Sequence, residues 1–341
     1  MTTIREGDLA LLMLHEGGMS YKEIAAQMKL SRDSVRGRIS RARRGRAEQT
    51  LPIGNTADRR PEADDHRYKE LTTRLSRLPR LARLLICSDQ HMPDHDPRAL
   101  ALAVKLAKAT QPDIIVLNGD TFDFPQISRF PQHHSTVKKD VFRAVRGAYH
   151  AHIHELSSAA PGAAIIHLDG NHNARLGSYL AEHTDFQETL LDEYRALVRA
   201  GNRVLYLGEV QELELPGLLI QHGTRYGKNA AAHALEDLGG NYPMVQGHTH
   251  RPASLYKKIK ARTPAGYHVV MSAVGGCLCN IPPAYTAHKT RQGAHQLQGV
   301  VLAHIDMRGG ALTNLQNVVF HSRADGALVA IVGNEVLEVR A

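Results

Sequence analysis

The sequence predicts an α/β protein with two packed sheets covered by helices, preceded by a small all-α domain. Between residues 82 and 200, apolar strand-like runs alternate with helical patterns, whereas strand-like runs dominate from residue 203 onward. A βαβαβ arrangement followed by mostly β structure is typical of two sheets sandwiched between helices. Residues 1–46 differ from the rest because they show helical periodicity and carry many arginines.

Composition supports a folded protein with a polyanionic partner. The chain has 341 residues, of which 43% are hydrophobic and 22% charged, as expected of a soluble protein with a substantial core. A formal charge of +8 suits a polyanion. The three cysteines cannot form a disulfide framework, and the spacing of Cys277 and Cys279 favours small semi-buried residues over an accessory role near a site. No signal peptide or long apolar run is present, so we expect a cytoplasmic protein that does not contact a membrane.

Residues 1–46 predict three short helices. The first covers about residues 6–16 and ends at a Gly-Gly pair. Ser20 and Glu23 have capping-box spacing at the start of the second helix. Ser31 caps a third helix that turns Val35 and Ile39 inward. This pattern resembles helix-turn-helix modules of the sigma-factor or homeodomain-like kind.

The third helix is the expected recognition helix, because arginines crowd its outward faces and the residues after it. Arginine suits both phosphate contacts and bidentate contacts to guanine. The candidate DNA-binding residues are Arg32, Arg36, Arg38, Arg41, Arg43 and Arg44. A solvated basic helix and a protein-docking module remain alternatives. Residues 47–81 are polar and irregular, and they predict a linker with a short helix over residues 68–81 before the first strand.

Five strand-like runs lead into side chains that carry oxygen or imidazole donors. The runs cover residues 84–88 and 113–118, a third run ending near Asp169, and residues 218–221 and 244–246. The donor residues that follow them are Asp89, His91, Asp120, Asn171, His172, His222, His248 and His250. Packing does not require such residues at so many strand ends, whereas divalent metals do. The sequence therefore predicts one binuclear metal site.

The remaining elements complete the large domain. Helices are predicted over residues 98–109, over 137–156 within an insertion at 121–161, and over 180–199. Further strands are predicted at 203–207, 209–215, 253–260, 267–273 and 298–306. Residues 307–341 predict a C-terminal β extension, to which we assign no function.

The order and spacing of the strand-end motifs resemble the calcineurin-like metallophosphoesterase family over residues 82–306. The resemblance rests on Asp89-Gln90-His91, Gly119-Asp120, Gly170-Asn171-His172, His222-Gly223 and Gly247-His248-Thr249-His250. It implies a four-layer α/β/β/α sandwich. It also implies that Asp89, His91, Asp120 and His250 hold one metal. Asp120 would bridge to a second metal held with Asn171, His222 and His248.

The resemblance implies a hydrolase. Two divalent ions about 3.5–4 Å apart polarise the phosphoryl oxygens and generate a bridging hydroxide that attacks phosphorus in line. Manganese is the expected metal, with zinc or iron as alternatives. His172 would contact the phosphate and protonate the leaving oxygen, the alternative being an orienting role. Asp123 and Arg175 lie near the motifs and are candidates for supporting or phosphate contacts, with Arg175 counted among the catalytic residues.

Two details qualify this resemblance. Many family members carry an acidic residue after Gly-Asn-His, where this chain has Asn173, so a supporting hydrogen bond and the local charge are in doubt. The segment over residues 272–285 is similar to phosphoesterases of phages and prophages, which suggests a bacterial or phage-infected cell.

Three functions follow from these features. The first is a phosphodiesterase or nuclease that acts on DNA and is recruited by the helix-turn-helix module. The second is a phosphomonoesterase or cyclic-nucleotide phosphodiesterase that acts on small substrates. The third is a DNA-binding regulator with an inactive phosphoesterase scaffold, although the complete ligand set argues against it. The form of nucleic acid and the assembly state, a homodimer included, are left open.

Overall fold

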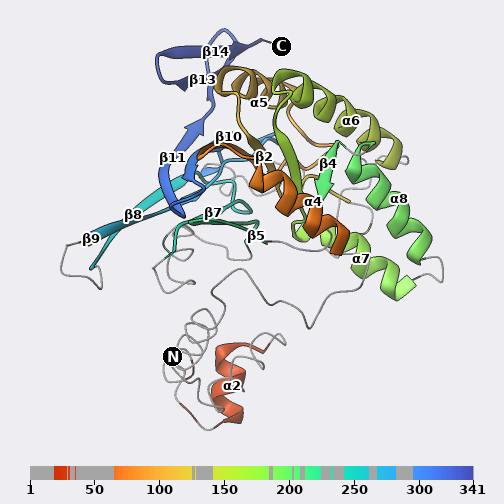
Figure 1. The fold of residues 1–341 in the computed structure, drawn as a ribbon. Helices are drawn as coiled ribbons and strands as arrows, with labels where there is room; N and C mark the ends of the chain where they lie inside the picture. The colour runs from red at the N-terminus through yellow and green to blue at the C-terminus, as the bar shows by residue number, and fades with distance from the viewer. Residues whose placement is uncertain are drawn as a thin grey trace.

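The computed structural model describes residues 19–28, 30, 35, 65–124, 127, 141–183, 187–201, 203–207, 212–223, 232, 242–260, 267–281 and 295–340. Within these residues, a six-stranded sheet, a five-stranded sheet and a three-stranded sheet pack with helices (Figure 1). The helix α2 (Tyr21–Gln27) begins with the expected capping box, since Ser20 and Glu23 exchange side-chain to backbone hydrogen bonds. The six arginines expected to bind DNA lie outside the described residues.

The six-stranded sheet has the order β11-β10-β1-β2-β3-β4. Its strands are β1 (Leu81–Cys87), β2 (Ile114–Asn118), β3 (Ala164–Leu168), β4 (Val204–Tyr206), β10 (Gly299–Asp306) and β11 (Ala311–Val319). Strands β1 to β4 are parallel, and β10 and β11 join antiparallel beside β1. The parallel strands therefore end at one edge of the sheet.

The five-stranded sheet has the order β5-β6-β7-β9-β8. Its strands are β5 (Glu212–Leu215), β6 (Leu218–Gln221), β7 (Met244–Gln246), β8 (Ala253–Lys260) and β9 (Tyr267–Val274). Strands β6, β7 and β9 are parallel, whereas β5 and β8 close the sheet antiparallel on either side.

Side-chain alternation in the central strands separates two hydrophobic clusters. In β2, Ile115 packs in a cluster with the helices, whereas Ile114 and Val116 pack between the two sheets. The helices of the first cluster are α5 (Pro97–Thr110), α6 (Val141–Ala159), α7 (Asn171–His183) and α8 (Gln187–Arg199). Because both faces are covered, β2 and β3 are buried along their whole length. Of the four expected layers, the described residues supply one helix layer and the two sheets.

The structure corrects two expectations about local structure and refines a third. The single helix expected over residues 180–199 is two helices, and the first of them already begins at Asn171. The short helix expected over residues 68–81 is present as α4 (Asp65–Ser76), and its Leu71 is buried in the cluster between the sheets, so this part of the expected linker packs on the large domain. The extension expected from residue 307 contributes β11 to the six-stranded sheet.

The last residues then form a small sheet of β12 (His321–Ser322), β13 (Leu328–Val332) and β14 (Glu335–Val339). Leu337 and Val339 pack on the helix-side cluster, and Lys105 of α5 donates to the carbonyl of Glu338 at 2.7 Å. The C-terminal extension therefore covers part of α5. None of the described helices has the length and the apolar character that crossing a membrane requires.

Candidate metal centre

The candidate centre lies where the parallel strands of both sheets end. Residues from five strand ends meet there: Asp89 and His91 after β1, Asp120 after β2, Asn171 and His172 after β3, His222 after β6, and His248 and His250 after β7. All of these side chains except those of Asn171 and His248 are almost fully buried. The two sheets, which pack through their inner faces, thus bring together residues up to 161 positions apart.

The first group consists of Asp89, His91 and His250. The Nε2 atom of His250 lies 3.1 Å from Asp89 Oδ1 and 3.1 Å from Nε2 of His91. Two donor atoms bound to one ion at about 2.1 Å lie about 3.0–3.4 Å apart at octahedral to tetrahedral angles. The spacing of these atoms therefore fits a shared cation. The backbone N–H of His248 donates to Asp89 Oδ2 at 2.9 Å and fixes this carboxylate.

The second group gathers around Asp120. Its Oδ2 lies 3.0 Å from His222 Nε2 and 4.0 Å from His91 Nε2, so this oxygen lies between the two groups. Asn171 Oδ1 lies 3.2 Å from the same His222 nitrogen. The ring centroid of His248 is 5.2 Å from that of His222. Asp120 therefore has the position that a bridging carboxylate needs.

Backbone conformation at these positions is unusual. Asp89, His91, Asp120, His248 and His250 all have left-handed φ values, between 46° and 70°. Non-glycine residues rarely adopt this region. Such conformations persist where the surrounding structure enforces them, and they cluster at functional sites.

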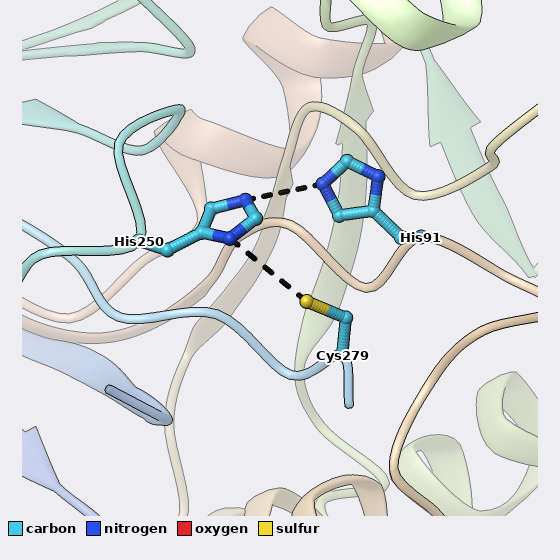
Figure 2. Close-up of side chains that lie close together, drawn as sticks. All are labelled: His91, His250 and Cys279. Carbon is cyan, nitrogen blue, oxygen red and sulfur yellow. Dashed lines mark hydrogen bonds between the residues drawn. The ribbon is translucent and has the colours of Figure 1, made fainter. Parts of the chain in front are cut away.

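Two histidines are held by their far ring nitrogens. His222 Nδ1 lies 3.0 Å from the carbonyl oxygen of Asn118, so Nδ1 carries a proton and Nε2 is the nitrogen that can bind a metal once its own proton has left. His250 Nδ1 lies 3.9 Å from Cys279 Sγ, while its Nε2 points to His91 (Figure 2). Cys279 is thus buried, as its spacing suggested, and it also contacts a candidate ligand.

The protonation of the cluster matches a cation site. Burial lowers the pKa of His222, but the carboxylates of Asp120 and Asp89 outweigh burial and raise it to about 9. The same histidines hold the pKa of both carboxyl groups below the ordinary value, against the effect of burial. In the metal-free chain, protons on histidine therefore balance two buried carboxylates. Divalent cations carry the charge needed to replace those protons.

A second cluster lies beside the centre at the start of α7. His172 Nδ1 lies 2.9 Å from Asp123 Oδ1, and Arg175 contacts both partners, with Nη1 3.2 Å from the same oxygen and Nη2 2.9 Å from His172 Nε2. Because arginine only donates, His172 Nε2 is an acceptor here and Nδ1 carries the proton. Burial lowers the pKa of His172 more than Asp120 and Asp123 raise it. His172 is therefore neutral in this state.

A buried polar network under α7 was not predicted from the sequence. The hydroxyls of Tyr194 and Tyr206 donate to the two oxygens of Asp169 at 2.8 and 2.7 Å. Asn173 Nδ2 donates to the Tyr194 hydroxyl at 3.0 Å. The only sequence signal was Asp169 itself, an acidic residue directly after a fully buried strand. The network ties the β3–α7 junction, which carries Asn171, to α8 and β4.

Comparisons with known proteins agree with this organisation. Residues 9–44 match the family model described as Sigma-70, region 4, which confirms the helix-turn-helix prediction. The Gene 54 protein of Mycobacterium phage D29 is 28% identical over 184 residues, covering 50% of this chain and 69% of that protein. This match agrees with the resemblance to phage proteins.

Solved structures align with 76% of the chain. Vps29 from Entamoeba histolytica is 12% identical, with 98% of its chain covered and a TM-score of 0.32. Vps29 from Chaetomium thermophilum is 11% identical, with 95% covered and a TM-score of 0.35. A dimetal phosphatase from Danio rerio is 11% identical, with 98% covered and a TM-score of 0.30.

The chain thus joins a Sigma-70 region 4 helix-turn-helix segment to an α/β domain whose paired sheets and strand-end side chains agree with its resemblance to the calcineurin-like metallophosphoesterases.

Proposed function

We propose that this protein is a divalent-metal-dependent phosphodiesterase that acts on DNA. The observation that carries the proposal is the convergence of two carboxylates, one amide and four imidazoles at five strand ends. Burying charged and polar groups of this kind costs free energy unless they bind a cation. Asp89, His91, Asp120 and His250 would hold one ion. Asn171, His222 and His248 would hold the other, with Asp120 shared.

Hard oxygens and neutral imidazoles suit manganese, iron or zinc, and we propose manganese as the working metal. When bound, a pair of such ions polarises phosphoryl oxygens and makes a nucleophile available from water at neutral pH. The protein's own side chains would have two tasks, which are to bind the substrate phosphate and to donate a proton to the leaving oxygen.

We assign these two tasks to His172 and Arg175. Both lie within the first five residues of α7, whose N-terminus favours negative charge. A bound phosphate that accepts hydrogen bonds from the Arg175 guanidinium would break the contact between Arg175 and Nε2 of His172. The negative charge of the phosphate also raises the pKa of His172 and favours the imidazolium, with Asp123 holding Nδ1. His172 then protonates the leaving oxygen from Nε2.

DNA is the proposed substrate because of the N-terminal segment. Sigma-70 region 4 matches residues 9–44, and this segment contains the arginines from Arg32 to Arg44. Helix-turn-helix segments place one helix in the major groove of duplex DNA. A binding module linked to a hydrolytic site raises the effective concentration of its ligand there.

The test compares a small phosphodiester, a small phosphomonoester, and duplex and single-stranded DNA in manganese. We expect hydrolysis of the diester and of DNA, with the monoester slower. His172→Ala should lower kcat about 10²–10⁴-fold while metal content, measured by elemental analysis, stays unchanged. The matched control is His154→Ala, because His154 is exposed on α6.

Two outcomes contradict the proposal. Turnover of the monoester with intact DNA would favour the small-substrate function. Inactivity on all substrates with several metals would favour the regulator with an inactive scaffold. Deleting residues 1–46 should weaken duplex binding and leave hydrolysis of the small diester in place.

A further inference from the structure

The segment after the last candidate ligands has an unusual charge composition. Between Asp237 and Asp306 the sequence contains no Asp or Glu. Acidic residues make up 34 of 341 residues, so about seven would be expected in a stretch of this length. The same stretch has seven basic residues: Arg251, Lys257, Lys258, Lys260, Arg262, Lys289 and Arg291. It accounts for most of the formal charge of +8.

Four of these basic residues lie in the described part of the chain, and three of the four belong to β8, the first strand of a hairpin that starts beside the candidate centre. Arg251 directly follows His250, and β8 begins two residues later at Ala253. Strands β8 and β9 pair antiparallel along their whole length, and β8 is the last strand of the five-stranded sheet. In Figure 1 the hairpin projects away from the body of the two sheets. Because strands rise about 3.3 Å per residue, Lys257 lies about 13 Å along β8 from Ala253.

The hairpin exposes aromatic and apolar side chains next to its lysines. Tyr256 is 59% exposed and Val269 is 57% exposed. Lys258 is paired with Val269 and Tyr256 with Met271, so these four side chains lie on one face. Lys257, on the other face, is also exposed. A positive surface with an exposed ring is the combination that binds single-stranded nucleic acid, since bases stack on rings while phosphates meet cations.

Protection of an edge strand is the competing explanation. Lysines on edge strands prevent pairing with other chains. Protection explains Lys257 and Lys258, but acidic residues protect an edge as well, and the stretch has none. It also does not explain Tyr256 and Val269, because exposed apolar side chains on an edge promote association.

We propose that the β8–β9 hairpin binds a single strand of DNA and leads it to the candidate metal centre. This inference deepens the proposed phosphodiesterase function and rests on it for the direction of the strand. Tyr256 stacks on a base and Lys258, on the same face, contacts a phosphate, while Lys257 reaches a neighbouring phosphate across the open edge of β8. Arg251 lies between this surface and His250, so it meets the strand where it enters the centre.

Binding of a fluorescent oligothymidylate to the full chain, measured by anisotropy, tests the hairpin. Oligothymidylate forms no duplex and has no major groove, so the helix-turn-helix segment cannot recognise it by placing a helix in a groove. Each phosphate contact to a single strand contributes a salt slope of about 0.7, or about fivefold in affinity at 0.1 M salt. Lys257→Ala with Lys258→Ala should therefore weaken binding about 25-fold and reduce the slope by about 1.4. Tyr256→Ala should weaken binding at least about fivefold, and Tyr256→Phe should retain it.

The matched control removes two exposed cations elsewhere, with Lys108→Ala and Arg308→Ala. Unchanged binding in the hairpin variants, or an equal loss in the control, would overturn the proposal. So would a change of oligomeric mass in the hairpin variants without a change in oligothymidylate binding, because the surface would then join two copies of the chain. Hydrolysis of a small diester is measured in parallel. If it is absent while the binding results hold, the hairpin stands and the proposed catalysis fails.

Discussion

Replacing Asn173 by aspartate restores the acidic residue that many calcineurin-like phosphoesterases carry after Gly-Asn-His, yet in this chain it should destabilise the fold. Asn173 is 2% exposed and donates to the hydroxyl of Tyr194, which in turn donates to Asp169. The position is therefore already linked to a buried carboxylate. An aspartate there loses the donor and adds a second negative charge.

The size of the destabilisation follows from the two hydrogen bonds that link Asn173 to Tyr194 and Tyr194 to Asp169. Their lengths of 3.0 and 2.8 Å place the two carboxylates at most about 6 Å apart. At an effective dielectric constant of about 20, two unit charges at that distance repel by about 3 kcal/mol. The Tyr194 hydroxyl has a single proton and serves only one of the carboxylates. We therefore expect Asn173→Asp to lower the melting temperature by about 4 °C.

The assay is thermal unfolding followed by circular dichroism in the presence of a chelator, since the chain has no tryptophan and bound metal would add its own stabilisation. Asp169→Asn combined with Asn173→Asp moves the single charge to position 173 and should recover most of the loss. The control Asn334→Asp lies in an exposed turn and should stay within about 0.5 kcal/mol of the native chain. A stable Asn173→Asp variant, or a double variant worse than both single variants, would refute the reasoning.

Three further predictions concern groups around the core and the centre. Burial lowers the pKa of His152 to about 3, below its ordinary value of about 6.5, so folding favours the neutral ring and stability falls as pH drops below about 6.5. The loss should be about 2 kcal/mol between pH 7.5 and 5, and His152→Leu should remove that share of it in unfolding experiments. Cys279→Ala should weaken manganese binding about 10–100-fold in chelator competition, because His250 loses its contact. Gly247→Ala should lower metal affinity and activity together, because the added Cβ lies 2.7 Å from an oxygen of Asp89.

Each of these three predictions can be checked against a control variant or a contrary result. Neither ring nitrogen of His152 has a hydrogen-bond partner among the described residues, so a large loss of stability at pH 7.5 in His152→Leu would contradict the assignment. Gly275→Ala meets its nearest atom at 3.4 Å and should be tolerated, in contrast to Gly247→Ala. Unchanged manganese affinity in Cys279→Ala would show that His250 is held without the thiol.

The sequence predicted the parts of the fold that depend on local pattern. Nearly continuous apolar runs located β1, β2 and β3, and the donor residues after them indicated which edge of the sheet carries the centre. The candidate ligands were predicted because carboxylate and imidazole groups recur after several strands. By contrast, the predicted helix started nine residues too late, because the polar residues at the start of α7 hid its beginning.

Contacts between distant residues were not readable from periodicity. Tyr194 and Tyr206 reach Asp169 from 25 and 37 positions away, and nothing in their own segments distinguishes them from ordinary core tyrosines. Cys279 reaches His250 across 29 positions in the same way. The pairing of β11 with β10 depends on the partner strand rather than on the sequence of β11, which reads as a generic strand. Sequence pattern therefore predicted which groups are present, and tertiary structure determined how they are held.

Backbone strain separates a functional cluster from a packed one. Among the described residues, seven non-glycine positions have left-handed φ values, and five of them are candidate metal ligands. The other two, Gln111 and Ala200, follow helices α5 and α8 directly, where left-handed residues end helices at little cost. The five candidate ligands have no such local reason, and each such conformation costs of order 1 kcal/mol or more. A core of similar polarity could satisfy its hydrogen bonds without this strain. The strain is explained if these carboxylate and imidazole groups are held toward ions that compensate for it when bound.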